Sequence, residues 1–146
     1  MTDPVCPATG DPMHRAVRPL TLTYKGESIT VDMPGWYCDR SDESIHTGDD
    51  MKVSDRALNR LKARVEGLLA PEEIRRIRKK LGLTQELAGE LIGGGPRAFQ
   101  KYETGELVPS RAVSSALVLL DHDPKALAVL EARQARAITR QHADVL

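Results

Sequence analysis

The chain has 146 residues, of which 40% are hydrophobic and 3% aromatic, and its 21 basic and 21 acidic side chains balance to a formal net charge of zero. That length fits one domain or two small domains with a mostly aliphatic core, and no apolar run approaches the roughly 18–20 residues that cross a bilayer. The first residues lack the basic and apolar regions of a signal peptide, so we expect a cytoplasmic protein whose two cysteines are reduced.

The charges are unevenly distributed along the chain. Residues 1–50 hold 4 basic and 9 acidic side chains, a net charge of −5, whereas residues 51–70 hold 5 and 2, a net charge of +3. The acidic first part suits a basic protein partner, and the basic remainder, centred on Arg75–Lys80, suits phosphate. A solvated helix face is the alternative explanation of that basic run.

The first fifty residues predict a small β-rich domain. Residues 20–24 and 28–32 alternate apolar and polar side chains as strands do, and residues 25–27 between them are typical of a hairpin turn. We expect a third strand through Trp36 and Tyr37. The expected core residues are Leu22, Val31 and Trp36.

A helix is predicted to connect this domain to the rest of the chain. The pattern changes near Asp49, and Ser54 is a candidate N-cap. Apolar residues then recur with a period of 3.6, at Ala57, Leu58, Leu61, Val65 and Leu68. We therefore place the N-terminal domain with its linking helix at residues 1–69 and a second domain at residues 70–146.

The second domain is predicted to contain five helices, which makes the fold class α+β with a compact repressor-like C-terminal part. Pro71, Ser110 after Pro109, and Pro124 mark three helix starts. Residues 133–146 are expected to be a helical extension or a frayed tail. The residues expected inside are Ile74, Ile77, Leu81, Val113, Leu117, Leu120, Ala126, Leu127 and Leu130.

Two of the five helices flank a glycine turn. Thr84 has the hydroxyl needed to cap the first of them, and Gly93–Gly95 stop it and allow a sharp change of direction. Pro96 suits the first turn of the second helix, which Gly105 closes. The first helix is expected to bury Leu87, Ala88 and Leu91.

The second of these helices separates its side chains by type. Arg97, Gln100 and Lys101 are expected to point outward, and Ala98, Phe99 and Tyr102 mostly inward. Most helix pairs joined by glycine merely pack a core, but such a pair would show mixed charges on its exposed face, and here Glu103 comes only at the end. We therefore interpret the pair as a helix-turn-helix whose second helix lies in a DNA major groove. The residues assigned to DNA contact are Thr84, Gln85, Gly95, Arg97, Gln100 and Lys101.

The last helices carry more apolar residues than one buried stripe needs. We interpret the surplus as a homodimer face, because helix-turn-helix proteins commonly read two half-sites as dimers. A fully apolar central helix inside the monomer is the alternative. The residues concerned are Val113, Ala116, Val118, Leu119, Leu127, Val129 and Leu130.

Several motifs together resemble a known family. In the C-terminal part they are Arg78–Leu81, Leu83–Gln85, Gly93–Gly95, Ala98–Phe99 and Tyr102–Glu103 with Gly105, and in the N-terminal part Cys6–Pro7, Gly10, Met13, Tyr24 with Gly26, Gly35 with Tyr37–Cys38, and Glu43–Ile45. Over nearly its whole length the chain resembles the MqsA (YgiT) type antitoxins of bacterial toxin–antitoxin operons. The resemblance implies an N-terminal zinc domain that binds a toxin, usually a small basic ribonuclease, and a C-terminal domain that dimerises and binds a palindrome in the operon's own promoter. It places base reading on Arg97 and Lys101.

The chain departs from that family at the zinc ligands. The family holds zinc with two Cys-x-x-Cys pairs, which here read Cys6-Pro-Ala-Thr9 and Cys38-Asp-Arg-Ser41. Neutral hydroxyls are poor zinc ligands, and no histidine or aspartate takes the lost spacing. We therefore expect no metal and no other cofactor, with both cysteines packed as small hydrophobes and both hydroxyls bonded to the turn backbones.

The leading functional hypothesis is an antitoxin that neutralises a toxin and represses its own operon. A toxin neutraliser with little regulatory role is one alternative, and a stand-alone repressor whose N-terminal domain senses something else is another. A neighbouring reading frame for a small basic protein would favour the first two. We do not expect an enzyme, because the four histidines are scattered and no nucleophile–base or P-loop motif occurs.

Overall fold

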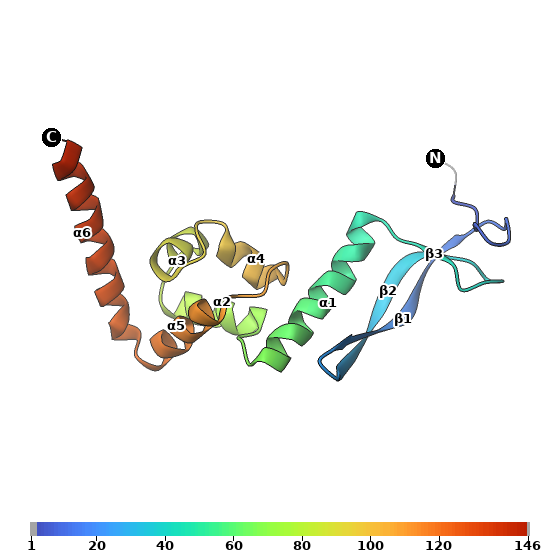
Figure 1. Cartoon of the computed structure of the whole chain (residues 1–146), viewed down its shortest axis with the longest axis horizontal. Helices are drawn as coiled ribbons and strands as arrows, with labels where there is room; N and C mark the ends of the chain where they lie inside the picture. The colour runs from blue at the N-terminus through green and yellow to red at the C-terminus, as the bar shows by residue number, and fades with distance from the viewer. Residues whose placement is uncertain (1–2, 146) are drawn as a thin grey trace. The chain divides into compact units, whose positions relative to one another are not determined.

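The structure, a computed structural model, describes the backbone of residues 3–145 and the side chains of residues 3–137 (Figure 1). Its internal contacts divide the chain into two compact units, Met1–Val65 and Glu66–Leu146. The boundary predicted from the sequence lies between residues 69 and 70. Within the described residues, a three-stranded antiparallel sheet precedes six α-helices, which confirms the α+β class.

The N-terminal unit is built on a long hairpin. Strand β1 (His14–Tyr24) pairs with β2 (Glu27–Tyr37) over their full lengths, and the short β3 (Ser44–Ile45) pairs with the end of β2. The two-residue turn at Lys25 and Gly26 has φ angles of 47° and 82°, the left-handed values that a tight hairpin turn requires.

Both strands are longer than predicted, and Trp36 and Tyr37 belong to β2 rather than to a third strand. Pro19 and Pro34 lie inside the strands without breaking them. Counted from the turn, both occupy positions whose missing N–H would have pointed away from the partner strand, so the hairpin loses no hydrogen bond.

The core of this unit differs from the one predicted. Leu22 and Val31 are only half-buried, whereas Cys6, Met13 and Cys38 form a fully buried cluster with Trp36 packed against it. The cluster forms because residues 4–13 fold back on themselves, with the Cys6 N–H donating to the Asp11 carbonyl at 2.8 Å. Met33 and Tyr37 are also buried, and the Tyr37 hydroxyl donates to the Met33 carbonyl at 2.6 Å.

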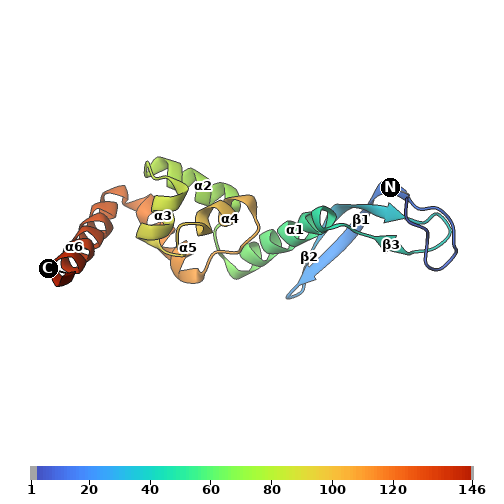
Figure 2. The ribbon, with the colours of Figure 1, turned by 90° about the horizontal axis from the view of Figure 1, so that it is seen from above.

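Helix α1 (Gly48–Glu66) starts before the predicted N-cap. Thr47 and Asp50 each accept a hydrogen bond from the other's backbone N–H, which is a capping box, and Ser54 lies inside the helix, where its hydroxyl donates to the Met51 carbonyl. Arg15 of β1 makes a bidentate ion pair with Asp50 at 2.8 Å, so α1 is fixed alongside the hairpin (Figure 2).

The second unit is helical. Its helices are α2 (Pro71–Lys80), α3 (Gln85–Ile92), α4 (Ala98–Thr104), α5 (Arg111–His122), the 3-10 helix η1 (Pro124–Ala126) and α6 (Leu127–Val145). Ser110 caps α5 as predicted, accepting from the Val113 N–H at 3.1 Å. Helix α6 takes in residues 133–145 of the predicted extension, and Leu146 lies outside the described residues.

One hydrophobic core joins the helices of this unit, and it agrees with the predicted inner residues except in α3. The fully buried residues of α3 are Ala88 and Gly89, and Leu91 is partly buried. Leu87 lies on another face of the helix and is 38% exposed. Phe99 lies at the centre with no exposed surface, and its ring meets Tyr102 edge-on at 5.4 Å. The buried members are Ile74, Ile77, Leu83, Ala88, Ala98, Phe99, Tyr102, Val113, Leu117, Leu120 and Leu127.

Candidate functional site

The candidate site is the α3–α4 segment, residues 84–105, and its shape depends on the glycine turn. Gly93, Gly94 and Gly95 have φ angles of 139°, 96° and 90°, which L side chains rarely adopt. Gly95 also lies against Gly89 of α3. A Cβ added at Gly89 would overlap the Gly95 carbonyl oxygen. Three consecutive glycines are therefore required for α4 to turn back onto α3.

Helix α4 presents a polar face outward. Ala98, Phe99 and Tyr102 are buried, as predicted, while Gln100 and Lys101 are exposed. Arg97 is also exposed, but it occupies the N-cap position, because α4 begins at Ala98 and Pro96 lies in the turn before it. Pro96 does not start the helix as predicted, since Pro96 and Arg97 complete the turn that follows the glycines. Contact of these side chains with DNA stays a prediction.

The start of α3 is set by Thr84. Its hydroxyl accepts from the Leu87 N–H at 3.1 Å, which confirms the predicted cap. Gln85 is the first residue of the helix and is half-buried, as is Gly95 in the turn. The structure thus brings all six residues assigned to DNA contact into the α3–α4 segment, at the start of α3 and around the start of α4.

Sequence reasoning missed how the segment is held in place. Arg78 of α2 makes a bidentate ion pair with Glu103 of α4, at 2.7 Å and 2.8 Å, and also donates to the Leu83 carbonyl at 2.9 Å. Both side chains are largely buried, with 12% and 6% of their surfaces exposed. The hydrogen bonds that Arg78 donates to the Glu103 carboxylate raise the pKa of Arg78. Glu103 is therefore neutralised by Arg78, and Arg78 is unavailable to phosphate.

Two further residues of the basic run of α2 are also held in ion pairs within the protein. Arg76 and Lys80 both contact the Asp121 carboxylate of α5, at 3.0 Å and 2.9 Å, and hold the pKa of that carboxyl well below its usual range. Arg75 and Lys79 are exposed and make no ion pair within the described side chains. No local pattern reveals these pairs, because the partners lie 41 and 45 residues apart.

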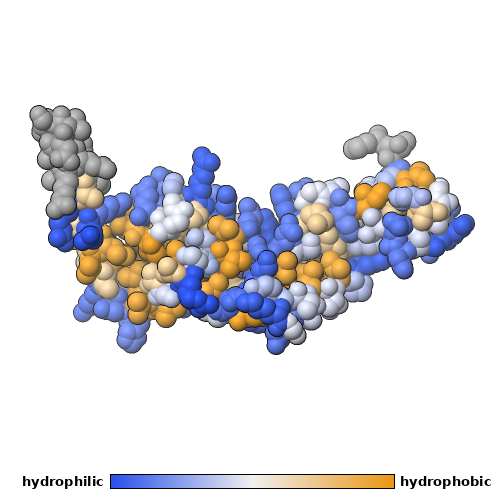
Figure 3. Space-filling view, viewed as in Figure 1, coloured by the Kyte–Doolittle hydropathy of each residue, from blue (hydrophilic) through white to orange (hydrophobic). Residues whose placement is uncertain are grey.

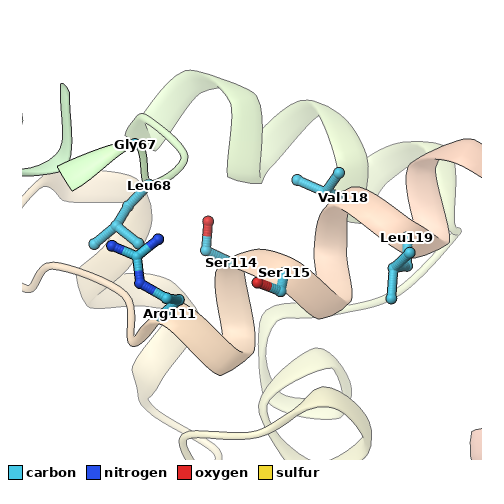
Figure 4. Close-up of a pocket in the computed structure, with 7 residues that line it drawn as sticks. All are labelled: Gly67, Leu68, Arg111, Ser114, Ser115, Val118 and Leu119. Carbon is cyan, nitrogen blue, oxygen red and sulfur yellow. The ribbon is translucent and has the colours of Figure 1, made fainter. Parts of the chain in front are cut away.

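The surplus apolar residues divide into two groups. Val113 and Leu127 are core residues and Ala116 and Leu130 are half-buried, whereas Val118, Leu119 and Val129 are 51%, 67% and 66% exposed. Figure 3 shows apolar side chains gathered on the surface over α5 and the start of α6. Val118 and Leu119 also line a groove of about 320 Å³ on α5 (Figure 4). The other lining residues are Gly67, Leu68, Arg111, Ser114 and Ser115.

In the N-terminal unit, two thiols and two hydroxyls come together from two loops. Cys6 Sγ lies 3.3 Å from Ser41 Oγ, and Cys38 Sγ lies 3.4 Å from Thr9 Oγ1. Hydrogen bonds from Ser41 and then Thr9 lower the pKa of the Cys6 thiol to about 6. The hydroxyls also accept from turn N–H groups, as predicted, Thr9 from Asp11 at 3.3 Å and Ser41 from Glu43 at 3.2 Å.

Comparison with known proteins agrees with this architecture. The profile of a family described as the antitoxin component of bacterial toxin-antitoxin systems, MqsA, matches residues 1–131. The chain belongs to the MqsA antitoxin family. Antitoxin MqsA of Escherichia coli (strain K12) is 33% identical over 129 residues, which cover 87% of this chain and 97% of that protein. The resemblance carried by the sequence motifs is therefore confirmed.

The donor set in this MqsA-family chain does not fit the zinc that the family resemblance implies. Two thiols and two neutral hydroxyls replace the four thiolates, and neutral hydroxyls bind zinc poorly. Four of the side chains that could substitute are engaged elsewhere: His14 contacts Asp39 at 3.4 Å, Asp11 contacts Arg40 at 3.2 Å, and His46 bonds the Pro34 carbonyl at 2.8 Å. Within the described side chains, no group of three or more His, Cys, Asp and Glu residues is placed to hold a metal ion.

No helix in the described part of the chain could span a bilayer.

Proposed function

We propose that this antitoxin acts in the cytoplasm without catalysis of its own, neutralising a cognate toxin through its N-terminal unit and repressing its own operon through its helical unit. The observation that carries the proposal is the outward face of the α3–α4 segment, where Arg97, Gln100 and Lys101 surround the start of α4. Arg and Lys side chains at the N-terminal end of a second helix suit base edges and phosphates in a major groove.

The supporting electrostatic argument is the neutralisation of Glu103. An unpaired carboxylate at the end of α4 would repel phosphate, but Arg78 pairs with it in a largely buried site. The exposed charges on and just before α4 are therefore the positive charges of Arg97 and Lys101, while the exposed carboxylates of this segment, Glu86 and Glu90, lie on α3. We infer that α4 is the DNA-reading helix and that α3 supports it against the phosphate backbone.

The test is a binding titration of the full chain on a duplex from its own promoter. Arg97→Ala and Lys101→Ala should each weaken binding, with about 1–3 kcal/mol for a lost base contact. Lys125→Ala removes an exposed positive charge on η1, outside the α3–α4 segment, and serves as the matched control. Unchanged affinity of the Arg97→Ala/Lys101→Ala double variant would rule out this face.

We further propose that the chain binds a palindromic operator as a homodimer through the exposed apolar residues of α5 and α6. Exposed aliphatic side chains lose unfavourable contact with water when a second copy covers them. Leu119→Glu should therefore produce a monomer in sedimentation at micromolar concentration. Leu107→Glu, which adds the same charge at an exposed position between α4 and α5, should leave the dimer intact.

Toxin neutralisation is assigned to the N-terminal unit because the helical unit carries the proposed DNA face. Co-expression with the product of the neighbouring reading frame, expected to be a small ribonuclease, tests this division. The Arg97→Ala/Lys101→Ala double variant should still rescue growth from the toxin while failing to repress the promoter. Failure to bind any neighbouring gene product, with repression retained, would favour a stand-alone repressor.

A further inference from the structure

The cluster of Cys6, Thr9, Cys38 and Ser41 joins two loops by crossed contacts. The first loop turns at residues 6–10, with the Gly10 N–H donating to the Cys6 carbonyl at 2.9 Å. In each crossed contact, a thiol of one loop meets a hydroxyl of the other, Cys6 with Ser41 and Cys38 with Thr9. The pairs thus bridge the two loops on which the family resemblance places the zinc ligands.

Backbone N–H groups occupy one acceptor position on each hydroxyl of this cluster. Each hydroxyl accepts an N–H from its own loop, Thr9 from Asp11 and Ser41 from Glu43. Both hydroxyls are half-buried, and each can donate its own proton to a sulfur: Ser41 to Cys6, and Thr9 to Cys38 across the gap or to Cys6 of its own loop. With these donors, each crossed contact is a hydrogen bond between the two loops.

The sulfur side of the cluster is closed off from water, whereas Thr9 and Ser41 are half-buried. Cys6 and Cys38 are 2% and 1% exposed, and they pack with Met13, which is 2% exposed, and with the half-buried Trp36. Apolar cover strengthens the hydrogen bonds and raises the cost of placing a doubly charged ion beside two neutral oxygens.

We propose that these crossed hydrogen bonds do in this chain what zinc does in a four-thiolate site: they hold the two loops of the N-terminal unit together without a metal. This inference is independent of the proposed antitoxin and repressor functions, because it concerns only how the unit is held. It also implies that the backbone keeps a geometry suited to metal, so that two side-chain changes should restore a metal site.

The first experiment measures metal in the purified full chain. Elemental analysis should find far less than one zinc per chain, and the melting temperature should be unchanged by chelator. About one zinc per chain, lost together with the fold of the N-terminal unit on chelation, would overturn the proposal.

The second experiment rebuilds the ligand set. The Thr9→Cys/Ser41→Cys double variant should take up about one zinc per chain and become sensitive to chelator, because four thiolates form a suitable tetrahedral set. A double variant that folds but takes up no zinc would show that the four positions do not surround a metal-sized site, and would overturn the implied geometry.

A third comparison isolates the hydrogen bonds. Thr9→Val and Ser41→Ala remove one hydroxyl each, and either change should lower the melting temperature of the metal-free protein and increase hydrogen exchange in residues 6–13 and 38–45. Ser28→Ala, which removes an exposed hydroxyl contact with Thr23 in the same unit, is the control and should change neither. Equal effects of all three variants would contradict a special role for the cluster.

Discussion

Arg78 and Glu103 are 25 residues apart in the sequence, yet they form a bidentate ion pair, with Nε to Oε2 at 2.7 Å and Nη2 to Oε1 at 2.8 Å. Because the third hydrogen bond of Arg78 reaches the Leu83 carbonyl, one guanidinium joins α2, the turn before α3 and the end of α4. The pair therefore sets the position of the proposed DNA-reading helix against the core.

Arg78→Met should strongly destabilise the helical unit. It leaves the Glu103 carboxylate largely buried without its partner, and breaking a buried pair in this way costs about 3–5 kcal/mol. Denaturant unfolding at neutral pH measures this loss. Arg75→Met, an exposed neighbour on α2, should cost less than 1 kcal/mol, and similar losses in both variants would contradict the role of the pair.

Gly89→Ala should distort the α3–α4 segment although alanine is the better helix former. The added Cβ would overlap the Gly95 carbonyl oxygen, so the glycine turn must shift and α4 with it. We expect lower stability and weaker promoter binding. Gly48→Ala in α1 is the control, because its Cβ meets nothing within 4 Å. A stable Gly89→Ala protein with unchanged binding would show that the close approach is unimportant.

Binding to the promoter should weaken steeply as salt rises, because phosphates neutralised by Arg and Lys release counterions. The slope of log affinity against log salt should become shallower by about one unit for Lys101→Ala if that side chain neutralises one phosphate. Fluorescence anisotropy over a salt series gives the slope. A Lys101→Ala slope equal to that of the parent would instead place this side chain on a base edge or away from DNA.

Acid should destabilise both units through two carboxylates. The pKa of Asp50 is held low by hydrogen bonds from Arg15 and the Thr47 N–H, and that of Asp121 by Arg76 and Lys80. A carboxyl whose pKa is lower in the folded state contributes stability above its unfolded pKa of about 4, and this is lost as pH falls further. The contribution of these two carboxylates should therefore be nearly constant from pH 7 to 5 and decline below about pH 4, whereas the Cys6 thiol, whose pKa is lowered to about 6, loses its own contribution as pH falls through about 6.

The control for the acid prediction is Asp121→Asn. It should be less stable than the parent at pH 7, since Arg76 and Lys80 lose a charged partner, and it should lose less stability on acidification. Thermal unfolding over a pH series checks both effects. An Asp121→Asn profile parallel to that of the parent would show that the Asp121 carboxylate contributes nothing to the decline.

Much of the helical unit could be predicted from the sequence, because the signals that define it are local. Thr84 and Ser110 cap helices within three residues of themselves, and the inward residues of α4 follow from a period of 3.6. The three glycines at 93–95 require a backbone that other residues avoid. The family resemblance rested on motifs of the same local kind.

Other features were decided only by tertiary structure, because they depend on which distant elements meet. Leu87 is apolar and lies in a helix, but α3 buries the face with Ala88 and Gly89 instead. Ser54 looks like a cap, yet Thr47 and Asp50 start the helix earlier, and Arg15 of a strand completes that network across 35 residues.

The same distinction applies to charge and to the sulfur–hydroxyl cluster. The sequence by itself determined that residues 75–80 are basic and that two zinc-ligand positions are hydroxyls. Only the fold decided that Arg76, Arg78 and Lys80 are used within the protein, and that Cys6 meets Ser41 while Cys38 meets Thr9. The reason is physical: an ion pair or hydrogen bond needs its two partners within about 3–4 Å, and chain topology, not local pattern, brings them to that distance.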